Sequence, residues 1–238
     1  MAKNDLGGED KNKNKNFLLG MVSGIAVLAV IGMVIFGTLY FTNKSADDGQ
    51  VAGEEIDNNE QQDEQPVNLE IAETDWVLGS RDAKVKVFEF SDFQCPYCAR
   101  FHEVMHQIVE EYPDDVAWIY KQFPIRSHPL GPPGAVATEC AGEQGKFWQM
   151  ADMIFENQDN LTEDSFAAFA QNLGLDMGKY NSCYENNPYE EKILTEYNLG
   201  VDLGVRGTPS NFINGQLVPG AVPYESMKQI VEDILQND

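Results

Sequence analysis

Residues 84–98 read KVKVFEFSDFQCPYC, and the fold is decided in this stretch. The first eight residues, 84–91, are strongly apolar and predict a strand that is largely buried. Residues 99–112 follow with apolar side chains at helical spacing, which predicts a helix. A C-x-x-C motif at 95–98 therefore lies directly after a strand and at the opening of a helix.

A cysteine at the N-terminus of a helix is placed for thiol chemistry. Pro96 suits the first helical position, where its missing N–H would have no partner in any case. The thiolate is the reactive form, and the helix dipole stabilises it by about 0.3–2 kcal/mol. That energy lowers a pKa by at most roughly 1.5 units. A strongly acidic Cys95 therefore also needs N–H groups bonded to its sulfur, while Cys98, one turn further in, would be the buried resolving thiol.

Zinc binding is the main alternative for a C-x-x-C motif, because such a pair is often half of a zinc site. The remaining cysteines, Cys140 and Cys183, lie 43 residues apart and form no second short pair. Residues 102–106 (HEVMH) spell the zinc-protease motif H-E-x-x-H, but no third-ligand motif follows. We interpret the match as coincidental and expect no metal.

The stretch FEFSDFQCPYC at 88–98, followed by a helix, resembles the thioredoxin superfamily and specifically the DsbA-like thiol–disulfide oxidoreductases. Glu89 stands where the superfamily carries a buried acid below the active site. Gly207-Thr208-Pro209, just before a strand, matches its cis-proline loop. The helical stretch after residue 131 falls where DsbA-like proteins insert a helical domain. The resemblance covers about residues 75–238 and makes Pro96-Tyr97 the active-site dipeptide.

Both family positions also have a physical rationale. Glu89 alternates with Val85 and Val87, so its carboxylate should share their apolar side of the strand, where desolvation raises its pKa. Such a group suits a proton acceptor for Cys98. A cis bond before Pro209 would aim the Thr208 backbone at the sulfurs, and an extended substrate could pair with that backbone. A solvated acid and an ordinary trans proline are the alternatives.

The rest of the domain reads as an α/β fold with a helical insertion. Residues 116–123 predict a second strand, and only helical patterns occur across the insertion, about 128–200. Strand character returns at 210–215, where Asn214-Gly215 favours a tight type I′ hairpin turn. A closing helix is expected at 224–235. The fold class is therefore a thioredoxin-like α/β fold with an inserted helical domain.

Cys140 and Cys183 fall in two helical stretches of the insertion. An uncharged N-terminal segment, residues 17–41, predicts that the domain lies outside the cytoplasm, in a compartment that permits disulfides. We therefore predict a structural disulfide between these two cysteines. The alternative is a pair of buried free thiols, because the required Cα separation of at most about 7 Å is not readable from sequence. His128 lies in a proline-rich loop that leads into the insertion; we interpret it as a loop residue, with a position near the active site as the alternative.

The N-terminal part reads as an anchor and a tether. Residues 17–41 carry no charge over 25 residues, enough to cross a membrane as a helix. Four lysines in 1–16 precede this segment, which favours a cytoplasmic tail and an extracytoplasmic C-terminal domain. A cleaved signal peptide is the alternative. Residues 42–73 hold ten acids and one lysine, so we predict a disordered linker before a domain at 74–238.

Composition narrows the function further. The chain has 39 acidic and 16 basic residues and a formal net charge of −23, which argues against nucleic-acid binding. The resemblance implies a membrane-tethered thiol–disulfide oxidoreductase that donates disulfides to exported proteins and is reoxidised by a membrane redox partner. It implies no dissociable cofactor, and we expect a monomer. A reductase or isomerase, and a peptide-binding module without redox turnover, are the alternatives.

Overall fold

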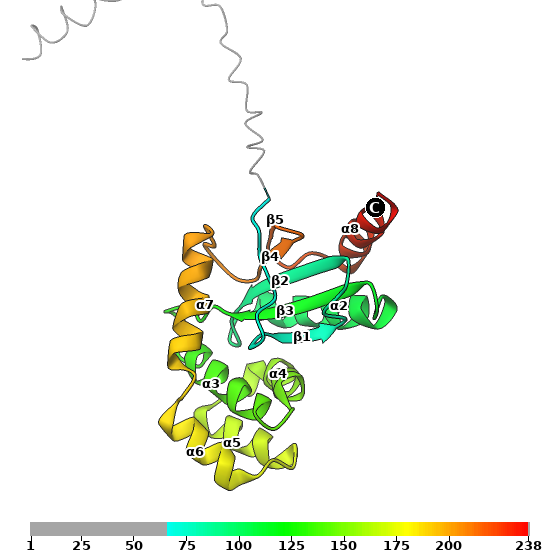
Figure 1. Cartoon of the computed structure of the whole chain (residues 1–238). Coiled ribbons are helices and arrows are strands. Elements are labelled where there is room, and N and C mark those ends of the chain that lie inside the picture. The colour runs from blue at the N-terminus through cyan, green and yellow to red at the C-terminus, as the bar shows by residue number, and fades with distance from the viewer. Residues whose placement is uncertain (1–65, 238) are drawn as a thin grey trace, which may run out of the picture. The chain divides into compact units, whose positions relative to one another are not determined.

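A five-stranded sheet in the order β1-β3-β2-β4-β5 runs through the domain in the computed structural model, which describes residues 66–237 (Figure 1). The strands are β1 (Trp76–Gly79), β2 (Val85–Ser91), β3 (Val116–Gln122), β4 (Ser210–Ile213) and β5 (Gln216–Pro219). Only β2 and β3 pair in parallel; the other three pairings are antiparallel. Asn214 and Gly215 both have positive φ, 46° and 86°, which confirms the expected hairpin turn between β4 and β5.

Strand β1 was missed by the sequence analysis. It has only four residues and pairs antiparallel with β3 at the sheet edge. Its residues are partly buried or exposed, so the pattern of a buried strand is absent there. The Nε1 atom of Trp76 donates a hydrogen bond of 2.8 Å to Glu139 of the insertion, which is a contact that no local pattern encodes.

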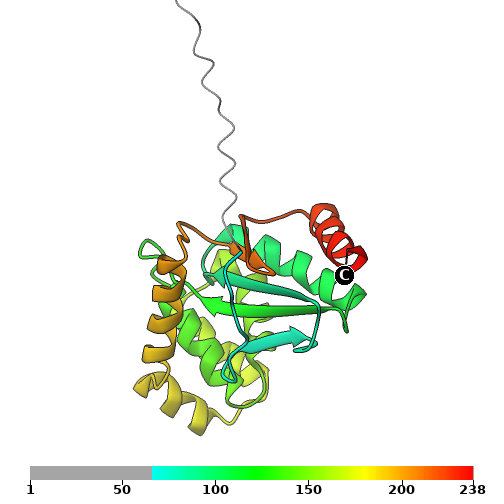
Figure 2. The same cartoon turned by 45° about the horizontal axis from the view of Figure 1, so that its top comes forward.

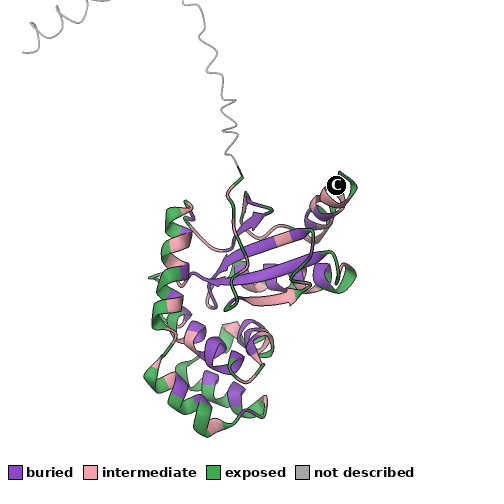
Figure 3. Cartoon of the chain, viewed as in Figure 1, coloured by how far each residue is buried: buried purple, intermediate pink, exposed green. Residues whose placement is uncertain are grey.

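Helices cover both faces of the sheet. On one face lie α2 (Pro96–Glu111) and α8 (Tyr224–Gln236), side by side over a core that includes Val85, Val87 and Trp118 (Figure 2). On the other face α7 (Glu190–Asp202) packs beside β3, and the buried rings of Phe88 and Phe90 point that way. Figure 3 shows the central strands buried, whereas the outer surfaces of the helices are exposed. Because the side chains of β2 alternate between the two faces of the sheet, they contribute to the core on each face.

The predicted helical insertion is present between β3 and β4. Its helices are α3 (Gly131–Gly142), α4 (Phe147–Glu156), α5 (Glu163–Asn172), α6 (Met177–Asn186) and α7, with a 3₁₀ turn at Gln158–Asn160. They enclose a separate apolar cluster that also contains Phe93, Cys95 and Cys98. The insertion therefore packs directly against the C-x-x-C segment.

Residues 66–73, which the sequence analysis assigned to the linker, pack against the domain. Val67, Leu69 and Ile71 contact the core beneath β2 and β4, and the Val67 N–H donates to the Gly215 carbonyl at 3.0 Å. Apolar residues at every second position give this acidic stretch one side that can be buried. The packed part of the chain thus begins before the boundary expected at residue 74.

Within residues 66–237, no helix combines the length and apolar character required to cross a membrane. The predicted cytoplasmic tail, anchor and most of the predicted linker lie outside the described residues.

Candidate active site

The two cysteines of the C-x-x-C motif open helix α2. Cys95 is the N-cap residue with extended backbone angles, and Pro96 occupies the first turn as expected. Cys95 is 4% exposed and Cys98 is fully buried, whereas the Tyr97 ring between them is 55% exposed. Both cysteines are free thiols here. Of the two cysteines, only Cys95 therefore retains any exposed surface.

The environment of Cys95 strongly favours its thiolate. A hydrogen bond from the Cys98 thiol and the backbone N–H groups of Cys98 and Tyr97 lower the pKa of Cys95 to about 5, against the opposing effect of burial. The sequence analysis attributed the shift to the helix terminus and its N–H groups. The largest single contribution instead comes from the neighbouring thiol, one helical turn away.

Cys98 has the opposite environment. Burial raises its pKa well above that of an ordinary thiol, and the nearby charges of Glu89 and Cys95 add to the shift. Glu89 is itself fully buried on β2. Burial raises the pKa of Glu89 to about 7, although a hydrogen bond of 2.8 Å from Trp118 Nε1 acts against this. Thiol and carboxyl are thus both fully buried, and the charge of Glu89 disfavours the ionisation of Cys98.

The loop before β4 completes the site. The Thr208–Pro209 peptide bond is cis, and the Cys95 thiol donates to the Thr208 carbonyl oxygen at 3.2 Å. A cleft of about 490 Å³ extends away from this loop, with Arg206 and Leu217 among its lining residues. The structure therefore brings Glu89, Cys95 and Cys98 together with Thr208, from segments more than one hundred residues apart in the chain.

Comparison with known proteins agrees with this geometry. The sequence profile of the thioredoxin family matches residues 71–233, which include both cysteines and the cis-proline loop. The chain belongs to the thioredoxin family. This thioredoxin domain superposes on the thiol–disulfide exchange protein alpha-DsbA2 of Wolbachia pipientis with a TM-score of 0.62 at 21% identity, covering 68% of this chain and 87% of that one. The expected membership of the thioredoxin superfamily is confirmed, and the fold is also that of the DsbA protein.

Two further proteins are similar to this chain, one over nearly its own whole length and the other over one part of it. A thioredoxin-like oxidoreductase from Silicibacter pomeroyi DSS-3 is 27% identical, with a TM-score of 0.61 over 70% of this chain and 95% of that one. A region of the Na(+)/H(+) antiporter NhaA 3 of Salinispora tropica is 30% identical over 158 residues, which is 66% of this chain. The chain spans about a quarter of the length of such antiporters (24%), so the match concerns one part of them.

Asp92 supports the thioredoxin active site and was not singled out from the sequence. Asp92 is buried at the start of the active-site loop and accepts hydrogen bonds from the backbone N–H groups of Gln94 and Ile125. His128 Nδ1 lies 3.0 Å from the same carboxylate, so this histidine is held at the site and is more than a loop residue. Burial raises the pKa of Asp92. An Asp next to a C-x-x-C motif was visible in the sequence, but its partners were not.

The insertion also holds the active-site loop in place. Gln158, in the 3₁₀ turn, donates through Nε2 to the carbonyl oxygens of Phe93 and Cys95, at 2.9 and 3.1 Å. A single amide side chain thus binds the backbone on both sides of Gln94. A lone glutamine in a loop carries no sequence signal for such a role.

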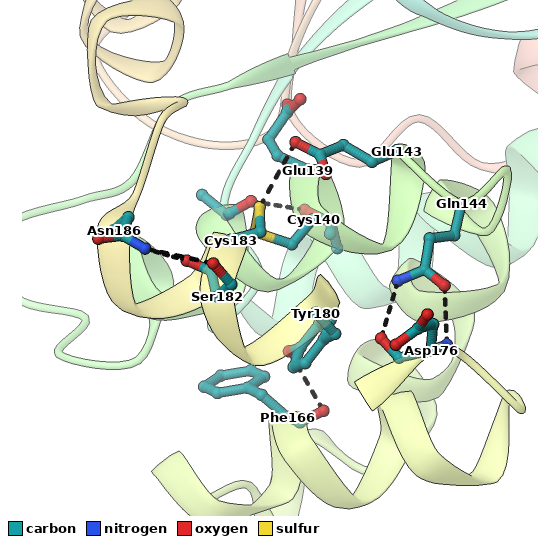
Figure 4. Close-up of a disulfide and its surroundings, with 12 residues drawn as sticks. Glu139, Cys140, Glu143, Gln144, Phe166, Asp176, Tyr180, Ser182, Cys183 and Asn186 are labelled. Atoms are coloured by element: carbon teal, nitrogen blue, oxygen red, sulfur yellow. Dashed lines mark hydrogen bonds between the residues drawn. A yellow bond between two sulfur atoms is a disulfide. The ribbon is translucent and has the colours of Figure 1, made fainter. Parts of the chain in front are cut away.

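Cys140 and Cys183 form a disulfide between α3 and α6, with Cα atoms 5.8 Å apart (Figure 4). Both residues are buried, as is Tyr180 of α6, whose hydroxyl donates to the Phe166 carbonyl of α5. The disulfide therefore joins helices inside the insertion and lies apart from the C-x-x-C pair in the chain.

The H-E-x-x-H motif has a partner that the sequence analysis did not find. Asp152 of α4 places Oδ1 2.7 Å from Nε2 of His102 and 2.9 Å from Nε2 of His106. No third-ligand motif follows in the local sequence, because Asp152 comes from another helix, 46 residues beyond His106.

Proposed function

We propose that this protein is a membrane-tethered, extracytoplasmic thiol–disulfide oxidoreductase that donates its disulfide to exported cysteine-containing proteins. One observation carries the proposal: the Cys95 thiol, with a pKa of about 5, lies at the helix N-terminus beside a fully buried thiol whose pKa is raised. A stabilised Cys95 thiolate favours the reduced form of the pair, and a pair that prefers to be reduced is an oxidant of its substrates.

The reaction begins with the oxidised protein, in which Cys95 and Cys98 are joined. A substrate thiolate attacks Cys95 Sγ, the bond between the two sulfurs breaks, and Cys98 departs as a thiolate. Its pKa is high, so it takes up a proton, and protonated Glu89 is the group placed to supply one. A second substrate thiolate then attacks the substrate sulfur of the mixed disulfide. This step forms the substrate disulfide and releases Cys95 as a thiolate.

The cis-proline loop supports substrate binding in this scheme. The backbone of Thr208 lies beside Cys95, and an extended peptide can pair with such a backbone as an added strand. Specificity would then come from side chains entering the adjacent cleft. No dissociable cofactor takes part in these steps, and reoxidation needs a membrane redox partner that accepts two electrons.

The redox equilibrium with glutathione tests the direction of transfer. We expect the Cys95–Cys98 pair to be far more oxidising than thioredoxin, whose potential is about −270 mV. The oxidised protein should form disulfides in a reduced unfolded substrate, and Cys95→Ser should abolish this activity. A potential near that of thioredoxin would instead indicate a reductase, and full turnover by Cys95→Ser would refute the proposal.

The membrane arrangement needs its own experiment. The uncharged segment 17–41 and the lysines before it support an anchor with the domain outside the cytoplasm. A reporter enzyme that matures only outside the cytoplasm, fused after residue 238, should be active and should sediment with membranes. An inactive reporter, or one released in soluble form, would contradict the tethered topology.

A further inference from the structure

Helix α2 and helix α4 bring three ligating atoms to one point outside the dithiol site. His102 and His106 are one turn apart on α2, so both side chains project from the same face of the helix. Asp152 reaches the same point from α4. The two Nε2 atoms are 3.1 Å apart, and Asp152 Oδ1 lies within 2.9 Å of both. We propose that His102, His106 and Asp152 form a binding site for a divalent transition-metal ion, with zinc as the first candidate.

The spacing of the three atoms fits such an ion. Zinc binds imidazole nitrogen and carboxylate oxygen at about 2.0–2.2 Å in tetrahedral geometry, which sets its ligand atoms roughly 3.3 Å apart. The observed separations of 2.7 to 3.1 Å are a few tenths of an ångström shorter. Two of the three side chains, His106 and Asp152, are about one-third exposed and come from different helices, so they have room to move apart.

Hydrogen bonding alone does not satisfy this cluster. If both Nε2 atoms carry hydrogens and donate to Asp152, two donors face each other at 3.1 Å. If one ring accepts from the other, its Nε2 lone pair faces the Asp152 carboxylate oxygen at 2.7 or 2.9 Å, so two acceptors face each other instead. A bound cation accepts lone pairs from both nitrogens and from the carboxylate oxygen at the same time.

The surroundings also favour a cation. A pocket of about 360 Å³ opens beside the three side chains, and its other lining residues include Glu103 and Glu156. No lysine or arginine of the described chain lines this pocket. Two histidines and one carboxylate with an open side, which water can fill, are a common ligand set for zinc and related ions. The site would connect α2 of the thioredoxin part to α4 of the insertion.

Calorimetric titration with zinc chloride tests the proposal on the full chain, purified without a histidine tag. Cys95 and Cys98 are kept oxidised so that no thiolate competes, since Cys140 and Cys183 are already paired. We expect one zinc per chain, and a Kd raised at least tenfold in His106→Ala and in Asp152→Asn. His128→Ala removes the only other histidine of the chain and should bind zinc normally. Wild-type affinity in both cluster variants, or no stoichiometric binding by the wild type, would overturn the site.

Two readouts separate the site from the cysteines and from misfolding. Cobalt bound by nitrogen and oxygen should give visible bands without thiolate charge transfer, and a charge-transfer band would place the metal on cysteine instead. Zinc should raise the thermal midpoint of the wild type, because a ligand that binds only the native state stabilises it. The same zinc concentration should leave the midpoint of Asp152→Asn unchanged, and an equal rise there would also overturn the proposal.

Discussion

Trp118 Nε1 donates a hydrogen bond of 2.8 Å to Oε2 of Glu89, in a region where neither side chain reaches solvent. The second oxygen, Oε1, is buried without a hydrogen-bond partner among the described residues. One oxygen of the carboxyl is thus held by Trp118 of β3, while the other has no such bond. A buried acid with this arrangement and a pKa of about 7 is suited to proton transfer at neutral pH.

Replacing Glu89 by glutamine should therefore slow thiol exchange. The substituted amide keeps the shape of the side chain and can still accept from Trp118, but it cannot supply or remove a proton. We expect the rate of disulfide transfer at pH 7 to fall about tenfold to a hundredfold, with loss of the inflection near pH 7. Stopped-flow fluorescence across pH 5–9 measures this. Glu110→Gln, at an exposed position of α2, is the matched control, and an equal effect there would refute the role of Glu89.

The same substitution should stabilise the folded protein at neutral pH. The pKa of Glu89 rises from 4.5 to about 7 on folding, so the native state binds more protons across that interval and stability falls as pH rises through it. At or above pH 7, this pKa shift lowers the free energy of unfolding by roughly 3 kcal/mol. In urea unfolding, the free energy of unfolding of Glu89→Gln should exceed that of the wild type by about 2–3 kcal/mol at pH 7.5 and by little at pH 4. A gain that does not depend on pH would contradict the assigned pKa.

The Cys98 thiol is expected to control the acidity of Cys95. Its hydrogen bond makes the largest contribution to lowering that pKa, so Cys98→Ala should raise the pKa of Cys95 clearly above 5. Cys98→Ser retains a hydroxyl donor and should raise it less. Thiolate absorbance at 240 nm across pH 3–10 gives both values. Unchanged titration in Cys98→Ala would assign the low pKa to the helix terminus alone.

Reduced and oxidised forms should differ in how their stability responds to pH. The pKa of Cys95 falls from 9.0 to about 5 on folding of the reduced protein, so the native state binds fewer protons between these values. Stability of the reduced form therefore rises with pH across this window and is lost as pH falls through 5. Chemical unfolding at pH 4 and pH 8 measures this. The free energy of unfolding of the reduced form should increase relative to that of the oxidised form only at the higher pH.

Removing the Cys140–Cys183 disulfide should destabilise the insertion without altering the dithiol. The bond closes a loop of 43 residues, for which chain entropy predicts roughly 4 kcal/mol. We expect Cys140→Ala/Cys183→Ala to lose about 2–4 kcal/mol of unfolding free energy. The pKa of Cys95 should stay near 5. A large shift of that pKa would show that the disulfide positions the active site.

Elements whose formation depends on neighbouring residues could be predicted from the sequence alone. Alternation along β2, helical spacing in α2 and the Asn214-Gly215 turn are local patterns, and each forms the predicted element. The position of C-x-x-C between strand and helix also followed from local order, and with it the family. Such features are readable because backbone periodicity and turn geometry depend on residues a few positions apart.

Contacts between groups that are distant in the chain could not be predicted in this way. Asp152 joins His102 and His106 from another helix, and Gln158 reaches the active-site loop from the insertion. His128 pairs with Asp92, and the edge strand β1 forms only because β3 is there to pair with it. These contacts depend on how helices and strands pack across the chain. Which residues of one element contact those of another depends on the packing of the whole core, and no periodic pattern in the sequence encodes it.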